Sequence, residues 1–166
     1  MKNETTAINF DQEADMLYPT LNKVEELLKE YQMVPVFYEV LADYMTPIRM
    51  FQALRKEGTP CFMLESVENK DQWGRYSFIG INPKSEIKIS GKELEVDGVK
   101  QEEEFKMSYL SDLIKKYKSP VMEDYPKLTG GLIGYFGYDM IRQVEKKLTN
   151  VPENDLKMPE CHLCMY

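Results

Sequence analysis

Apolar residues recur at intervals of three and four in several segments, and this spacing predicts amphipathic helices. Thr20 can cap the first of them. Thr46-Pro47 is a clear start for the second, because a hydroxyl cap precedes a proline at the first helical position. The predicted helices cover about residues 20–31, 46–58, 108–117 and 139–147.

Short apolar or alternating runs predict β-strands over residues 34–40, 61–65, 75–81, 130–138 and 161–166. Between residues 86 and 96, two short alternating runs are separated by a turn at Gly91. Apolar and polar residues alternate between 86 and 96, and Asp97-Gly98 is a strong hairpin signal. We therefore expect an antiparallel meander with one face in water. Short antiparallel strands combined with capped helices indicate an α+β fold.

Composition narrows the class of protein. The chain has 21 Lys and Arg against 28 Asp and Glu, which gives a net charge of −7. This balance argues against binding of nucleic acid or an anionic membrane surface, because both require a basic face. No run of about 18 apolar residues is present to span a bilayer. Three cysteines are too few for a disulfide scaffold and favour a reducing cytoplasm.

We expect two parts along the chain, a loosely held lead-in over residues 1–17 and one domain over residues 18–166. The lead-in has neither the basic start nor the apolar core of a signal peptide. The chain stops inside the predicted strand 161–166, whereas natural C-termini usually lie exposed and frayed. The 166 residues are therefore expected to be a fragment of a longer protein.

Cys161-His162-Leu163-Cys164 is a candidate metal motif that we interpret as part of the core. Zinc needs four ligands, and no second pair occurs in the sequence. On a strand, residues three apart also point to opposite faces. His162 is the only histidine, which removes most schemes of nucleophilic catalysis through a histidine. A zinc or redox module around these cysteines stays a minor alternative.

A second candidate site lies where an apolar strand enters a polar loop. Glu65 and Ser66 stand at that strand end, and Arg75 begins the next predicted strand. Glu65 could face an ammonium group, while Ser66 and Arg75 could face a carboxylate. The residue types allow an amino-acid pocket here, although a simple strand terminus with a serine turn explains the same pattern.

Three motifs in order resemble one enzyme family. Phe62-Met-Leu-Glu-Ser-Val67 resembles the LLES segment of anthranilate synthase component I, and Trp73-Gly-Arg-Tyr-Ser-Phe-Ile-Gly80 resembles its WGRYSFIG stretch. Gly130-Gly-Leu-Ile-Gly-Tyr-Phe-Gly-Tyr-Asp139 resembles its GGxxGYxxYD segment. The segments 34–37 and 41–47 match as well. The resemblance covers nearly all of the chain after its first 30 or so residues.

The resemblance implies an α+β fold with antiparallel sheets packed as a sandwich and helices outside. It implies that the complete protein is a lyase of tryptophan biosynthesis, which converts chorismate to anthranilate and pyruvate. Ammonia would come from a glutamine amidotransferase subunit, and Mg²⁺ would support the chemistry. The chorismate and Mg²⁺ residues belong to a C-terminal catalytic domain whose motifs are absent here. We therefore expect no catalytic or metal-binding residue in this chain and no activity of the chain alone.

The resemblance further identifies the chain as the N-terminal regulatory domain, which holds much of the feedback site for L-tryptophan. By motif match, Ser66 would be the central residue of that site, and Glu65 would bind the ammonium group of tryptophan. Arg75 corresponds to a basic residue of the pocket. Two alternatives stay open. One is aminodeoxychorismate synthase component I of folate synthesis, and the other is a stand-alone tryptophan-binding or scaffold module.

Overall fold

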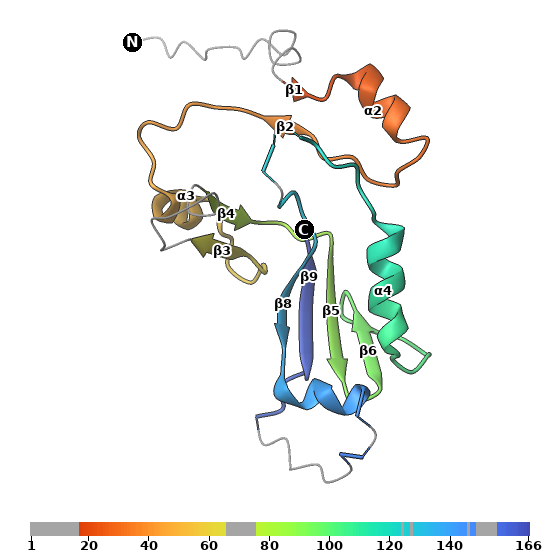
Figure 1. Cartoon of the computed structure of the whole chain (residues 1–166). Helices are drawn as coiled ribbons and strands as arrows, with labels where there is room; N and C mark the ends of the chain where they lie inside the picture. Colours follow the sequence, from red (N-terminus) through yellow and green to blue (C-terminus); the bar gives the residue numbers. More distant parts are fainter. Residues whose placement is uncertain (1–16, 66–75, 124, 127, 146, 149–155) are drawn as a thin grey trace. The chain divides into compact units, whose positions relative to one another are not determined.

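The structure is a computed structural model of the whole chain (Figure 1). It describes residues 17–65, 76–123, 125–126, 128–145, 147–148 and 156–166. The chain divides into two compact units, and each is described by itself. The first unit takes residues up to Asp43 and residues 113–129, and the second takes Tyr44–Asp112 and Gly130–Tyr166.

The first unit is built around a small aromatic stack. β1 (Leu17–Tyr18) pairs antiparallel with β2 (Phe37–Tyr38), and α2 (Leu21–Leu27) lies between them in sequence. The Tyr125 ring stacks on Phe37, with 3.8 Å between the ring centroids, and lies 5.0 Å from Tyr18. The predicted lead-in lies outside the described residues except for Leu17, which pairs in β1.

The predicted helix 20–31 is present but shorter, and its cap differs from the prediction. Thr20 occupies the cap position, yet its side chain makes no capping hydrogen bond. The predicted strand 34–40 contracts to the two residues of β2. The described residues of this unit leave large apolar side chains such as Leu21 and Leu41 exposed. Little packing therefore stabilises its strands and its helix, and these elements are short.

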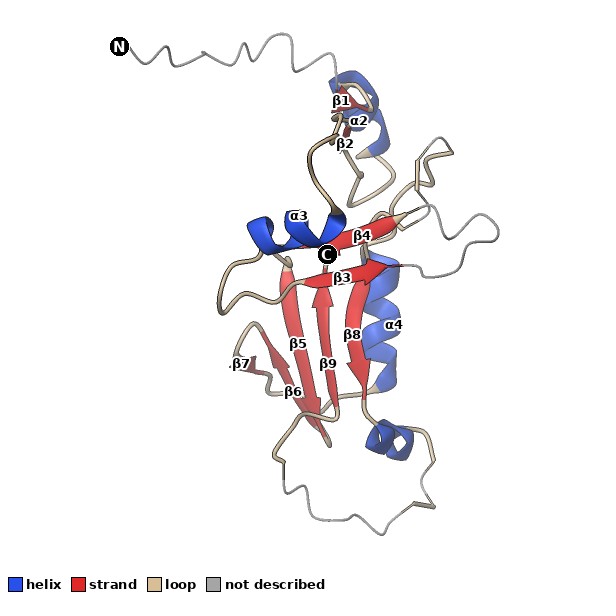
Figure 2. Ribbon diagram, turned by 90° about the vertical axis from the view of Figure 1, so that its left-hand side faces the viewer, coloured by secondary structure: helices blue, strands red, loops and turns tan. Residues whose placement is uncertain are grey.

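The second unit contains a five-stranded antiparallel sheet in the order β7-β6-β5-β9-β8 (Figure 2). Its strands are β5 (Ser85–Ser90), β6 (Glu93–Val96), β7 (Val99–Lys100), β8 (Leu132–Phe136) and β9 (Cys161–Met165). The strand that comes last in the sequence therefore pairs with β5 on one side and β8 on the other. The predicted hairpin turn is confirmed, since Asp97 and Gly98 adopt φ angles of 53° and 76° between β6 and β7.

One face of this sheet, called the core face below, holds most of the buried apolar side chains. The register places them on the same side, and all are at most 6% exposed: Ile87, Ile89, Leu94, Cys161, Leu163 and Met165. Phe105 and Leu110 are buried too, just before and within α4 (Met107–Lys116). Figure 2 shows α4 behind the sheet. The predicted alternation of apolar and polar residues along β5 and β6 therefore gives the sheet one apolar face and one polar face.

A second, two-stranded sheet completes the unit. β3 (Phe62–Glu65) pairs antiparallel with β4 (Ser77–Gly80), and α3 (Pro47–Leu54) packs against β4 (Figure 2). The predicted start of α3 is confirmed, because the Thr46 hydroxyl accepts a hydrogen bond from the Arg49 backbone amide at 3.3 Å. The α+β class with antiparallel sheets and separate helices is confirmed.

Two predicted elements near the C-terminal end differ in detail. The predicted strand 130–138 contracts to β8, because Gly130 and Gly131 adopt φ angles of 153° and 139°. These angles lie in a region that glycine favours. The predicted helix 139–147 is a 3₁₀ helix, η2 (Tyr138–Gln143).

Candidate functional site

The end of β3 carries the one predicted site residue that the structure describes. Glu65 is the last residue of β3, its side chain is exposed, and it pairs in register with Ser77 at the start of β4. Ser66 and Arg75 lie outside the described residues. The predicted end of this strand is confirmed, because the apolar run of the sequence stops where the pairing of β3 with β4 stops.

The sheet face opposite the core face holds a cluster of charged residues that sequence reasoning missed. Glu86 Oε1 lies 2.7 Å from His162 Nε2 and 3.1 Å from Lys88 Nζ. The Tyr135 ring meets the His162 ring edge-on, with 6.0 Å between centroids. The alternation along β5 placed Glu86 and Lys88 on a polar face, but their pairing with His162 depends on strand register, which local patterns do not encode.

This cluster is not arranged for nucleophilic catalysis. Cys164 Sγ lies 4.0 Å from the same nitrogen, His162 Nε2, that contacts Glu86. In a catalytic triad the acid and the nucleophile occupy different ring nitrogens of the histidine. Burial also raises the pKa of the Cys164 thiol, with a further contribution from Glu86, so the reactive thiolate is disfavoured.

The Cys161-x-x-Cys164 motif is split between the two faces of β9, as predicted. Cys161 is fully buried on the core face, and burial raises the pKa of its thiol to about 11. Cys164 lies on the opposite face beside His162. This burial agrees with the interpretation of both cysteines as core residues. In the part of the chain that the structure describes, no group of three or more His, Cys, Asp and Glu side chains could hold a metal ion.

A small, mostly apolar cavity of about 160 Å³ lies between the start of β3 and the middle parts of β8 and β9. Its walls are Pro60, Cys61, Phe62, Ile133, Gly134, Tyr135, His162, Cys164 and Tyr166. The Phe62 and Tyr166 rings meet edge-on across it, with 4.8 Å between centroids. The cavity therefore marks the place where the two-stranded sheet rests on the five-stranded one.

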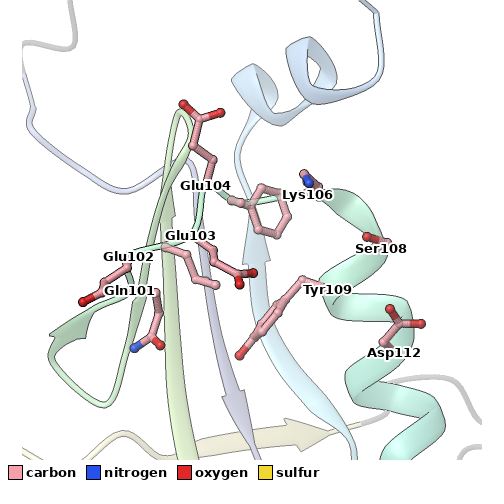
Figure 3. A pocket seen from close by; sticks show the side chains of 10 residues that line it. Gln101, Glu102, Glu103, Glu104, Lys106, Ser108, Tyr109 and Asp112 are labelled. Carbon is pink, nitrogen blue, oxygen red and sulfur yellow. The ribbon is translucent and has the colours of Figure 1, made fainter.

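A larger groove of about 490 Å³ runs between the loop after β7 and the first turns of α4 (Figure 3). The loop brings Glu102, Glu103 and Glu104 to one side, and α4 brings Tyr109 and Asp112 to the other. The concentration of carboxylates disfavours an anionic ligand such as a carboxylic acid.

No helix in the described ranges combines the length and the apolar character needed to cross a membrane.

The elements described above define an α+β domain with antiparallel sheets. Comparisons with known proteins give its family. The chain is 41% identical over 157 residues to anthranilate synthase component 1 of Acetivibrio thermocellus, which covers 89% of the chain and 30% of that protein. It is 36% identical over 133 residues to the Acinetobacter calcoaceticus protein of the same name, which covers 75% of the chain and 27% of that protein. On these identities, the chain belongs to the anthranilate synthase component I family.

More distant relatives include a plant protein. Anthranilate synthase alpha subunit 2, chloroplastic, of Arabidopsis thaliana is 32% identical over 168 residues, which cover 92% of the chain and 27% of that protein. A solved structure of anthranilate synthase component I from Streptococcus pneumoniae matches with a TM-score of 0.47 and 26% identity, over 78% of the chain and 28% of that structure. No family model matches the chain. The chain spans less than a third of the length of these relatives.

Proposed function

We propose that the chain is the N-terminal regulatory domain of an anthranilate synthase component I and carries part of a feedback site for L-tryptophan. The 41% identity over 89% of the chain is the observation that carries this proposal. The order of the three motifs and their match to the N-terminal part of the family support it.

The proposed site is formed by Glu65, Ser66 and Arg75. Glu65 ends β3 with an exposed carboxylate that is available to the ammonium group of an amino acid. Ser66 follows it directly, and Arg75 stands two residues before β4. A hydroxyl and a guanidinium are suited to the carboxylate of the same ligand, and the three groups together match a zwitterion.

The complete protein would combine this domain with a C-terminal catalytic domain and a glutamine amidotransferase subunit. It would convert chorismate and ammonia to anthranilate and pyruvate. By the family resemblance, Mg²⁺ would be held by the catalytic domain, and no chemical step is assigned to this chain.

The proposed regulation is allosteric. Tryptophan would bind more tightly to a state of the protein that binds chorismate poorly, because an effector shifts an equilibrium only through its different affinities for the two states. Typical coupling free energies are about 1–3 kcal/mol, and chorismate would weaken tryptophan binding by the same factor.

Substitution of Ser66 in the complete protein tests the site. We expect Ser66→Ala to raise the tryptophan concentration for half-maximal inhibition by about tenfold or more, because a hydrogen bond to a charged carboxylate contributes about 1.5–3 kcal/mol. The measurement is anthranilate fluorescence at increasing L-tryptophan, scaled to the same variant without tryptophan. Ser77→Ala, an exposed serine opposite Glu65, is the matched control. Unchanged inhibition in Ser66→Ala would count against the assignment.

The chain alone is expected to form no anthranilate from chorismate, ammonia and Mg²⁺. The elimination of pyruvate needs acid–base and metal-binding groups, and the family resemblance assigns these groups to the C-terminal catalytic domain. The same fluorescence assay gives the readout, with the complete protein as the positive control. Turnover above background by the 166 residues would contradict the division of roles proposed here.

A further inference from the structure

The Phe62 ring is held from two sides at the start of β3. Phe62 pairs with Gly80 in the ladder, and its ring occupies the space where a side chain at position 80 would stand. A Cβ added at Gly80 would overlap three atoms of the ring. The ring edge also meets Tyr166 at a centroid distance of 4.8 Å and an interplanar angle of 79°. The absence of a side chain at Gly80 therefore lets Phe62 lie across β4 and reach the larger sheet.

Tyr166 is held in place by its backbone. Its backbone amide donates to the Gly131 carbonyl at 3.0 Å, and its carbonyl accepts from the Gly131 amide at 2.9 Å. Its side chain lines the same cavity as that of Cys164, which is buried. The contact thus joins β3 to the β8–β9 part of the five-stranded sheet.

The β3–β4 ladder needs such support. It has two strands of four residues, and a two-stranded ladder is marginally stable by itself in water. Its far end is solvated, since Leu64 is 48% exposed and Glu65 is exposed as well. α3 packs against β4, whereas Phe62 supplies the ring contact from β3 to the sheet.

We propose that Phe62, seated on Gly80 and against Tyr166, is a positioning residue that holds the Glu65 end of β3 in place for the effector amino acid. This inference rests on the proposed function, because it assigns Phe62 a role in tryptophan inhibition. Phe62 does not touch the effector. It fixes the direction of β3 and therefore the position of Glu65, three residues further along the strand.

The test uses the complete protein and measures L-tryptophan inhibition for three variants. In Gly80→Ala the new methyl group displaces the ring, and in Phe62→Leu the ring is lost. Each is expected to raise the tryptophan concentration for half-maximal inhibition by about fivefold or more, the lower range of typical allosteric coupling. The double variant should lose less inhibition than the two single variants add up to, because the new methyl group no longer meets a ring.

Phe105→Leu is the matched control for lost stability. Phe105 is a phenylalanine of the same unit, 4% exposed, and lies in the sequence just before α4. We expect Phe105→Leu to lower the melting temperature without changing tryptophan inhibition. If Phe105→Leu weakens inhibition as much as Phe62→Leu at an equal loss of stability, the effect is general destabilisation and the inference is wrong.

Ser66→Ala separates failure of the inference from failure of the proposed function. If Ser66→Ala relieves inhibition while Gly80→Ala and Phe62→Leu leave it unchanged, the positioning role is overturned and the feedback site stands. If tryptophan does not inhibit the unmodified protein, the proposed feedback role fails and the inference fails with it. Purely additive effects of Gly80→Ala and Phe62→Leu would also overturn the proposed contact.

Discussion

At the scale of single residues, Glu86 connects the polar groups of the sheet face opposite the core. Partial burial acts to raise the pKa of Glu86, but the hydrogen bonds and positive charges of Lys88 and His162 outweigh it. The pKa of this carboxyl therefore lies below its ordinary value of 4.5. A carboxyl whose pKa is lowered by folding stabilises the folded state when it is ionised.

We predict that Glu86→Gln makes the stability of the chain less sensitive to acid. The contribution of Glu86 is fully present above the unfolded-state pKa and is lost as the pH falls through the lower, folded-state pKa. Urea unfolding at several pH values between about 5 and 3 should therefore show a smaller fall in the free energy of unfolding for the variant.

Glu103→Gln is the matched control for this prediction, because it removes an equal charge from an exposed glutamate of the loop after β7. An acid response of Glu86→Gln equal to that of the unmodified chain would show that the contacts with Lys88 and His162 do not stabilise the ionised carboxyl.

At the scale of elements, α3 is the helix whose start the sequence specifies best. Thr46 accepts a hydrogen bond from the Arg49 amide, and Pro47 occupies the first helical position. We predict that Thr46→Ala lowers the free energy of unfolding by about 1 kcal/mol, because one amide of the first turn loses its partner. Thr46→Ser retains the hydroxyl and should cost less.

Thr20→Ala gives a second comparison for the same measurement. Thr20 occupies the corresponding position before α2 but makes no side-chain capping bond, so its removal should cost less than that of Thr46. Urea unfolding followed by helical circular dichroism checks all three variants. A larger loss for Thr20→Ala would contradict the difference between the two caps.

Local chemistry explains which parts of the fold could be predicted from the sequence. Thr46-Pro47 and Asp97-Gly98 determine the backbone within a few residues, so the start of α3 and the β6–β7 turn were found. The pairing of β9 with both β5 and β8 depends on residues far apart in the chain, and no local pattern contains it. The contact between Glu86 and His162 was missed for the same reason.

The candidate site was predictable to a similar degree. Glu65 was placed at a strand end from the change in polarity along the chain, and β3 ends there. The role of Gly80 was not predictable, because it follows from the cross-strand pairing with Phe62 and from the position of Tyr166. Ser66 and Arg75 stay predictions of the motif match.

At the scale of the whole molecule, the two units differ in how much apolar surface they bury. Among the described residues, all ten buried hydrophobic side chains belong to the second unit. In the first unit, large apolar side chains such as Leu21, Leu41 and Val121 are 72%, 87% and 90% exposed. Stability is therefore expected to be concentrated in the second unit.

Hydrogen–deuterium exchange of the intact chain tests this expectation. The amides of β5 and β9 should exchange most slowly, because both strands are paired on two sides and carry buried residues. The amides of β2 and α2 should exchange much faster. Equal protection of the two groups, measured by mass spectrometry, would show that the first unit gains stability from a source other than apolar burial.

The position of β9 between β5 and β8 has a consequence for how the chain folds during synthesis. β5, β6 and β7 follow one another directly and can pair as soon as they leave the ribosome, whereas β8 has no partner strand until β9 is made. β5 and β8 must meanwhile remain soluble with their pairing edges open, a condition that favours aggregation. Closure of the sheet also requires contacts between distant segments, which slow folding. The rate of sheet assembly should therefore depend on the arrival of residues 161–165 more than on any hairpin made earlier.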